Sequence, residues 1–513
     1  MRLFEVGERY FNELINRGMI RPFHLVHDTA IDACYVHDMV LDMICSLSKE
    51  ENYVSILGSN EQLTSLQGNV RRLAIQNGVI DKHGPLANTR TQQLRSFNAT
   101  RCRIDAMPSL SKFEALRVLD FEWCNCVSGA SYHVKHLGKL LQLRYLGLPR
   151  IPITELPEEI GDLKFLETLN IRQTEIKELP LGVGRLRQLK CISMQFGCVK
   201  VPDWLGNLTS LEELSVDNVS KSSNFVKQLG KLTELRRLSI WIGELGAESW
   251  KCKAFMESLE KLQKIHELHI WSTEEANLET HVAYWQLREL HLDTRSARLP
   301  LWINSSILPN LTNLWASLKA VNEQDTEILG KLPELLTVKL VIRASDDGGY
   351  NVPPCECSGD AFPKLKHYNM PAPLRALKGA MPSVESIRFK AHVSFLMDSN
   401  FDFDFSSLGN LPLLEKVMVD IVCTDANARE VEETEAAVTR AVQVHPNRPF
   451  LSFIRHGWYV LLTEDFTSKK ERLVQPCHQL QKTGSSFFDL NSDMKQTRYT
   501  ISKKSTCALS LFL

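Results

Sequence analysis

Leucines and isoleucines recur at fixed intervals between Leu143 and Leu208, where three segments with the same pattern lie end to end. Each segment begins with L-x-x-L-x-L or a close variant, and the leading residues Leu143, Leu166 and Leu189 are 23 residues apart. The alternation of apolar and variable positions predicts a short β-strand, because successive side chains of a strand point to opposite faces. A proline and further apolar residues follow in every copy, which predicts a turn that carries the chain back.

The same pattern continues in weaker form over most of the chain. Twelve further copies begin at Val70, Leu94, Leu116, Leu211, Leu235, Ile265, Leu287, Leu311, Leu335, Leu365, Val384 and Leu414. With the three clear copies they make 15 units, which are spaced by 19 to 30 residues. This period is typical of leucine-rich repeats, in which each coil buries its leucines against the next coil. Residues 58–455 are therefore expected to form an α/β repeat, a solenoid of about 13–15 units with a curved parallel β-sheet on its concave face.

A leucine-rich helical protein is the alternative explanation of such a composition. It needs apolar positions with a period of about 3.6 residues, and it tolerates few prolines. Pro157, Pro180 and Pro202 instead recur at about the same place in successive coils. The position of the prolines thus favours the solenoid over a helical bundle.

Both ends of the chain depart from the repeat pattern. Residues 1–57 contain two amphipathic helical patterns, around Leu14 and Ile44, and then a short strand pattern. These elements suit a small, mainly helical winged-helix remnant. The acidic run that begins at Glu430 predicts a helix that caps the last coil. After residue 455 the leucine pattern stops, and the Ser-, Thr- and Gln-rich residues 456–513 are expected to be disordered.

Two motifs in the first segment resemble a known family. GERYFNELI at residues 7–15 is followed by YVHDMVLD at residues 35–42, ahead of the leucine-rich repeats. In this order they are similar to the winged-helix segment of plant intracellular immune receptors, the nucleotide-binding leucine-rich repeat disease resistance proteins, and most similar to the cereal coiled-coil type. The resemblance covers about residues 1–455. It implies a role in plant innate immunity, as the sensor and autoinhibitory region of a nucleotide-switched receptor in truncated form.

The resemblance has a limit at the nucleotide site. In the family, a coiled-coil domain and a P-loop domain precede the winged helix, but G-x-x-x-x-G-K-[ST] does not occur in this sequence. We therefore expect no cofactor and no ATP hydrolysis for this chain by itself, whereas complete family members bind ADP or ATP. His37 and Asp38 stand where the family's Met-His-Asp motif closes over ADP, and an imidazole can donate a hydrogen bond to phosphate. The alternative is that both residues are vestigial here.

Side chains between the leucines should face the concave side of the solenoid. On neighbouring coils these positions are rich in aromatic and basic residues, and tryptophan and arginine are the types that most often carry binding energy at interfaces. The candidates for a partner-binding surface are Arg236, Arg237, Trp241, His269, Trp271, His291 and Trp315, with His266, Arg288 and Asp293 beside them. The alternative is that the tryptophans cover irregular coils and pack on their neighbours, because the repeat spacing loosens in this region.

Composition and charge narrow the class of protein further. The net charge of -1 gives no reason to expect a nucleic acid or an anionic membrane as partner. The sequence has neither a long uncharged apolar run nor a signal-peptide pattern, so we expect no membrane span and a cytoplasmic location, with nuclear entry left open. Cys355 and Cys357 lack a second pair of ligands, which favours a surface loop over a metal site.

Three classes of function can be compared at this point. The resemblance favours a receptor region that binds a pathogen effector, a guarded host protein, or the nucleotide-binding domain of a parent or paired receptor. A leucine-rich repeat adaptor, such as the substrate-recognition arm of a ubiquitin ligase, would need an F-box-like module at its N-terminus, where YVHDMV stands instead. An enzyme has no support, because the sequence contains no nucleophile elbow, metal-ligand spacing or phosphate loop.

Overall fold

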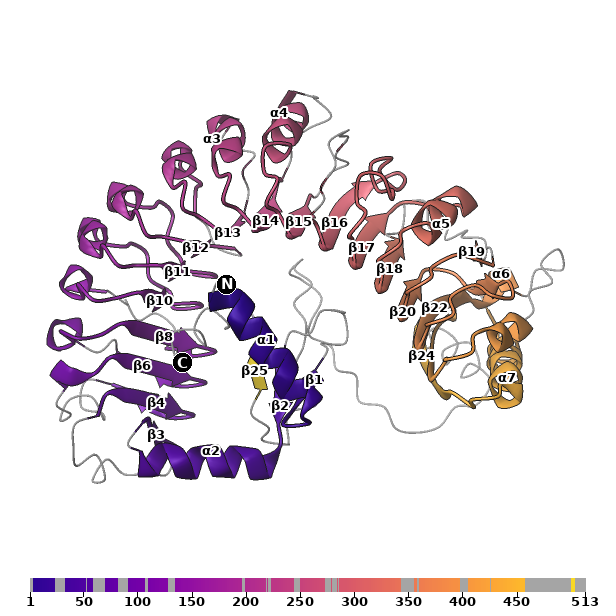
Figure 1. The fold of residues 1–513 in the computed structure, drawn as a ribbon, viewed down its shortest axis with the longest axis horizontal. Coiled ribbons are helices and arrows are strands. Elements are labelled where there is room, and N and C mark those ends of the chain that lie inside the picture. Colours follow the sequence, from indigo (N-terminus) through magenta and orange to yellow (C-terminus); the bar gives the residue numbers. More distant parts are fainter. Residues whose placement is uncertain are drawn as a thin grey trace, which may run out of the picture.

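A curved solenoid forms the body of the molecule, with strands along its inner side and turns and helices along its outer side (Figure 1). The computed structural model describes residues 3–23, 33–51, 53–58, 70–81, 91–106, 109–127, 134–195, 199–217, 219, 223–243, 250–272, 278, 284, 286–342, 355–357, 359–396, 405–424, 426–456 and 500–502. Neighbouring coils pair through parallel strands, so the predicted leucine-rich repeat solenoid is confirmed.

The large sheet runs through the described coils in chain order. Its strands are β3 (Ser55–Leu57), β4 (Arg72–Gln76), β6 (Ser96–Thr100), β8 (Val118–Glu122), β10 (Tyr145–Gly147), β11 (Thr168–Asn170), β12 (Cys191–Ser193), β13 (Glu213–Val216), β14 (Arg237–Trp241), β15 (Glu267–Trp271), β16 (Glu289–Ser296), β17 (Asn313–Leu318), β18 (Thr337–Ile342), β20 (His367–Met370), β22 (Ser386–His392), β23 (Lys416–Val422) and β24 (Phe450–His456).

Every one of the 15 predicted leading residues stands two positions before one of these strands. Two strands of the sheet were not predicted as repeat units. β3 was assigned from sequence to the winged-helix segment, but it pairs with β4 and opens the sheet. β24 pairs with β23 and closes the series. Both lie at an end of the solenoid, where the full leucine pattern is not needed because only one neighbouring coil has to be covered.

The outer side of the coils changes along the chain. Short 3-10 helices return the chain in the first coils, and three of them, η5 (Glu158–Asp162), η6 (Leu181–Arg185) and η7 (Asp203–Asn207), directly follow the recurring prolines. Proline suits this place because its fixed φ matches the start of a helix and its missing N–H is not needed there. The further 3-10 helices are η2 (Thr91–Gln93), η3 (Leu110–Lys112), η4 (Leu137–Lys139), η9 (Leu229–Lys231) and η10 (Phe405–Asn410).

In the later coils α-helices also take this place. They are α3 (Ser223–Gln228), α4 (Trp250–Leu259), α5 (Glu323–Gly330), α6 (Val393–Leu396) and α7 (Ala428–Val444). Short strands outside the large sheet are β5 (Val79–Ile80), β7 (Arg103–Ile104), β9 (Asn125–Cys126), β19 (Cys355–Cys357) and β21 (Leu374–Ala376). β19 replaces the loop that was expected around the two cysteines, because its backbone pairs with β21 of the next coil. The predicted acidic helix is α7, which Asn427 and Glu430 begin with a reciprocal capping box.

The core is one continuous stack of leucines that runs from Leu57 to Val442. Leu166 and Leu169 of one coil are 0% exposed, since the coils on either side cover them. Polar groups also join the coils on the outer side. The Glu158 carboxylate accepts hydrogen bonds from the backbone N–H groups of Leu181 (3.1 Å) and Gly182 (2.8 Å) in the next coil. A Cβ at position 182 would lie 2.2 Å from the Glu158 carbonyl oxygen, so this close approach requires glycine.

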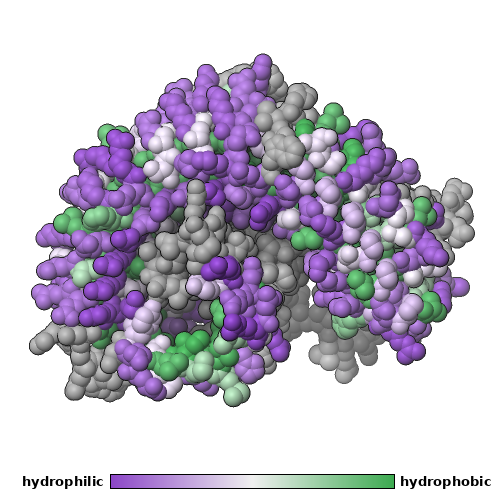
Figure 2. All heavy atoms as spheres, in the orientation of Figure 1, coloured by the Kyte–Doolittle hydropathy of each residue, from purple (hydrophilic) through white to green (hydrophobic). Residues whose placement is uncertain are grey.

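The N-terminal segment forms a separate group of elements: α1 (Leu3–Asn16), β1 (Ile20–Phe23), β2 (Ala33–Val36) and α2 (Asp38–Glu50). β1 and β2 form an antiparallel hairpin between the two helices. The apolar side of α2 is exposed, at Met39 (76%), Ile44 (46%) and Leu47 (50%), and Figure 2 shows it as an apolar strip along that helix. Of the tail that was expected to be disordered, β25 (Thr500–Ser502) is described, and it pairs with β2 because the edge of a hairpin offers unpaired backbone groups.

The first prediction tests the register of the stack. Leu169→Asp places a carboxylate among buried leucines without a partner, and we expect it to lower the free energy of unfolding by several kcal/mol. Lys177→Asp, at an exposed position of the same coil, is the matched control and should change stability little. Urea denaturation of both variants measures the difference, and equal losses would show that Leu169 does not point into the stack.

Candidate functional site

The concave side of β14 to β17 carries the residues that the sequence singled out. In β14 and β15 half-buried and buried residues alternate along the strand, so that Leu238 and Ile240 point into the core while Arg237 and Trp241 point outward. The same alternation places His269, Trp271 and His291 on the concave side of the next two strands. Arg236 lies one residue before β14, at the edge of the sheet, with its guanidinium 3.6 Å from Glu212.

Strand pairing brings the aromatic members together. Trp241 is the register neighbour of Trp271, and His269 is followed on successive strands by His291 and Trp315. We call these five side chains, Trp241, His269, Trp271, His291 and Trp315, the aromatic row. All five are half-buried. The row therefore spans four adjacent coils of the concave face.

Ring contacts hold most of the row in place. His291 stacks on Trp315 with ring centroids 3.9 Å apart, and it also contacts Trp271 at 5.3 Å and His269 at 5.4 Å. His269 meets Trp271 edge-on at 5.7 Å. Trp271 and Trp315 thus pack against neighbouring rings of the aromatic row. Both still expose part of their rings, so packing within the row leaves an apolar surface for a partner.

Carboxylates lie directly beside the aromatic row. Arg237 forms ion pairs with Glu213 at 2.9 Å and with Glu267 at 3.8 Å, and His269 Nε2 lies 2.9 Å from a Glu289 oxygen. Burial raises the pKa of the Glu267 carboxyl, the Arg237 guanidinium opposes this shift, and the Glu289 carboxylate adds to it. The row is thus rigid and lined by charge, which suits recognition of a partner better than chemistry on a substrate.

The described part of the chain contains neither a metal-ligand cluster nor a membrane-spanning helix. No group of three or more His, Cys, Asp or Glu side chains with the geometry of a metal site occurs among the described residues. Cys357 is buried, and the side chain of Cys355 lies outside the described part of the structure. No helix in the described ranges is long and apolar enough to cross a membrane.

His37 and Asp38 lie on the surface of the N-terminal segment. His37 precedes α2, and its Nδ1 accepts a hydrogen bond from the Met39 backbone N–H at 3.3 Å. Asp38 is in the first turn of α2, where a carboxylate interacts favourably with the positive end of the helix dipole. Both side chains are exposed. In this position both residues stabilise the start of α2, and a nucleotide could contact them only from the solvent-exposed side of the segment.

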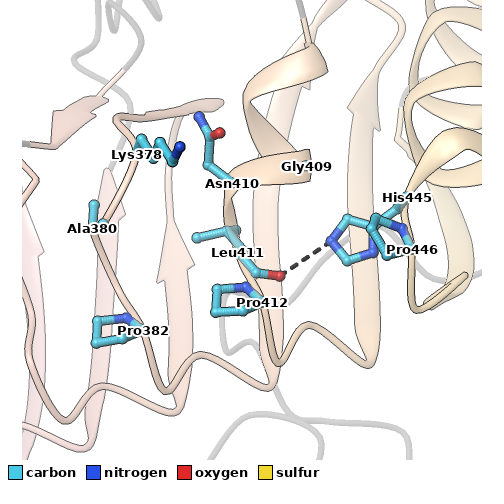
Figure 3. Close-up of a pocket in the computed structure, with 10 residues that line it drawn as sticks. Lys378, Ala380, Pro382, Gly409, Asn410, Leu411, Pro412, His445 and Pro446 are labelled. Atoms are coloured by element: carbon cyan, nitrogen blue, oxygen red, sulfur yellow. Dashed lines mark hydrogen bonds between the residues drawn. The ribbon is translucent and has the colours of Figure 1, made fainter.

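A pocket of about 430 Å³ lies between the last coils (Figure 3). His445 reaches into its wall, where its Nε2 donates to the Leu411 carbonyl oxygen at 3.1 Å and its Nδ1 accepts from the Asn447 backbone N–H at 3.1 Å. Both ring nitrogens are therefore used within the chain. The nearby Asn410 side chain donates to the Ala376 carbonyl oxygen. The polar groups of this pocket hold adjacent coils together, and we assign it no ligand.

The sequence did not predict two polar features of the concave face, an ion pair and a buried carboxyl group. In the last coils Arg388 binds Asp420 through two hydrogen bonds of 2.8 and 2.9 Å, and the two side chains are only 13% and 8% exposed. The residues belong to neighbouring strands 32 positions apart. Their pairing could have been proposed only from the exact repeat register, which places Asp420 beside Lys390, two residues along β22 from Arg388 on the same face.

The second group surrounds Asp120 in the first coils. Asp120 is buried, and a Cβ on Gly147 of the next coil would lie 2.1 Å from its Oδ1. Burial raises the pKa of the Asp120 carboxyl to about 8, the Glu122 carboxylate adds to the shift, and the Arg172 guanidinium opposes it. Asp120 is therefore largely protonated at neutral pH.

The parallel strands and the stacked leucine core together define a leucine-rich repeat protein. Residues 93–451 match the family model of the leucine-rich repeat region, and residues 1–44 match that of the disease resistance protein winged helix domain. The first match alone covers more than half of the chain. The chain belongs to the leucine-rich repeat family, and its two matched regions are those of plant disease resistance proteins.

Curated relatives carry the same description. Disease resistance protein PIK6-NP of Oryza sativa subsp. japonica is 29% identical over 386 residues, which cover 66% of this chain and 36% of that protein. Pik-2 of the same rice is 26% identical, with 80% of this chain and 45% of that protein covered. For RGA5 of the same rice the identity is 24% and the shares are 94% and 43%. This chain thus spans less than half of the length of these relatives.

Solved structures show similar repeats at low identity. A leucine-rich repeat protein of Leptospira interrogans has a TM-score of 0.45 and 15% identity, with 77% of this chain and 99% of that one covered. An internalin of Listeria monocytogenes has a TM-score of 0.40 and 14% identity, with shares of 74% and 86%.

The second prediction concerns the pH dependence of stability through Asp120. The folded carboxyl loses its proton near pH 8, whereas an unfolded one does so near 3.9. Between these values the folded state binds more protons, so its stability falls as pH rises. Asp120→Asn should reduce this fall between pH 5 and 8 in urea denaturation. The control Asp105→Asn, at a surface pair with Arg103, should keep the wild-type profile, and an unchanged profile in Asp120→Asn would contradict the assignment.

Proposed function

We propose that this chain is the sensor and autoinhibitory region of a nucleotide-switched plant disease resistance protein, and that the aromatic row is its partner-binding surface. The observation that carries the proposal is the contact series from His269 and Trp271 through His291 to Trp315 on the concave face. Half-exposed aromatic rings fixed by their neighbours offer a large apolar contact at a low entropic cost. A protein partner is the natural cover for such a surface.

The partner can be a pathogen effector, a guarded host protein, or the nucleotide-binding domain of a parent or paired receptor. Recognition would act through differential binding, because a ligand shifts a receptor between closed and open arrangements only if it binds one of them more tightly. The exposed apolar side of α2, with Met39, Ile44 and Leu47, supports a further domain beside the winged-helix segment. We infer a cytoplasmic setting for these contacts, with nuclear entry left open.

His37 and Asp38 would serve as nucleotide-sensing residues only where a complete nucleotide-binding domain lies against them. Their exposure on the surface of the segment supports this assignment to a larger receptor. For the chain alone we propose no cofactor and no enzymatic activity, whereas ADP or ATP belongs to complete family members. The adaptor function for a ubiquitin ligase is less favoured, because residues 1–44 match a winged helix and not an F-box-like module.

The third prediction tests the aromatic row in the full-length receptor that contains this chain. The double variant Trp271→Ala and His291→Ala removes two central rings that are half-exposed. We expect a melting temperature within a few degrees of wild type, because both rings lie outside the leucine core, and loss or deregulation of the cell-death response in leaf expression.

Trp271→Phe is the matched control, since it keeps an apolar ring at the same place, and it should retain most of the response. A large fall in melting temperature together with normal signalling in the double variant would show that the aromatic row serves packing alone.

A further inference from the structure

One residue in each coil forms a continuous ladder along the edge where the strands begin. It is the residue directly after the leading residue, and its backbone N–H donates to the carbonyl oxygen of the same position in the preceding coil. Arg95 N bonds Arg71 O at 2.7 Å, Arg117 N bonds Arg95 O at 2.7 Å, and the series continues at 2.8 Å to Arg144. We call this the edge ladder. Adjacent rungs lie about 4.8 Å apart, the spacing of paired strands.

The middle rungs of the edge ladder alternate in charge. They are Arg144, Glu167, Lys190, Glu212 and Arg236. The Glu167 carboxylate lies 2.9 Å from the Arg144 side chain and 3.1 Å from that of Lys190, and Glu212 lies 3.6 Å from Arg236. Glu167 thus pairs with the basic rungs on both sides of it, and Glu212 pairs with the basic rung that follows it.

The first three rungs break this alternation. Arg71, Arg95 and Arg117 follow one another with exposed side chains, and among the described residues none of the three guanidinium groups has a carboxylate within salt-bridge distance. Like charges on adjacent strands repel, so the series costs stability and is not explained by folding. The surrounding residues 70–150 hold 13 Lys and Arg against 5 Asp and Glu, in a chain whose net charge is -1.

We propose that Arg71, Arg95 and Arg117 bind an extended acidic segment of a partner protein, whose carboxylates take the place of the negative rungs. The arginine fork matches a carboxylate through two parallel hydrogen bonds. The rungs form a line on an exposed edge, which suits an extended chain rather than a compact anion. The middle rungs demonstrate within the same molecule that carboxylates fit this spacing. This surface is separate from the aromatic row and extends over the first coils.

The test uses the full chain and a fluorescein-labelled decaglutamate peptide, with binding followed by fluorescence anisotropy at low salt. Arg95→Glu restores the alternation between Arg71 and Arg117. We therefore expect it to weaken peptide binding at least tenfold and to raise the melting temperature by about one degree. Lys139→Glu, an exposed position in η4 on the outer side, makes the same change in net charge and should alter binding less than threefold.

Four outcomes would overturn the proposal. A wild-type chain that does not bind the peptide removes its basis. Equal weakening in Lys139→Glu would show a diffuse charge effect instead of a site. A lower melting temperature in Arg95→Glu would mean that the chain itself already satisfies the arginines. Tighter binding of a labelled oligothymidylate of the same length would assign the surface to nucleic acid.

Discussion

A single coil of this solenoid cannot cover its own leucines, so each coil is stable only because the next one buries it. Leu166 and Leu169 have no exposed surface, and the same holds for their equivalents in the neighbouring coils. The parallel strands fix the distance between coils through their backbone hydrogen bonds. Folding therefore depends on the inward positions and the backbone, while the outward positions of the sheet are set at a constant spacing without having to contribute to the core.

This division explains why the concave face can hold charged and half-exposed aromatic side chains that a core would not tolerate. The aromatic row adds ring contacts across adjacent coils, and the carboxylates beside it pair with Arg237 and His269. At the edge of the same sheet, charges alternate in the middle coils, where neighbouring side chains form ion pairs. In the first coils arginines follow one another without such pairs among the described residues. Both surfaces follow from one geometric rule, because the repeat brings equivalent side chains of successive coils into line.

Much of the fold could be predicted because the inward positions repeat. Each leading leucine marked a strand two positions later, and the prolines marked the starts of η5 to η7. β3 and β24 were missed because a terminal strand has one neighbour and needs less of the pattern. The candidate site was predicted only in part. Alternation showed which face Trp271 and His291 occupy, but it could not show that their rings touch, and the pair of Arg388 and Asp420 depends on register over 32 residues.

Hydroxyl-radical footprinting of the full-length receptor, followed by mass spectrometry, tests most directly whether the aromatic row is covered by a partner. Trp241, Trp271 and Trp315 are compared in this chain alone and in the receptor bound to the protein it recognises. Trp123, which is 49% exposed on the first coils, serves as the internal reference. We expect oxidation of the three tryptophans in the isolated chain and protection in the complex, with Trp123 unchanged. Equal oxidation of the three in both states would contradict this expectation.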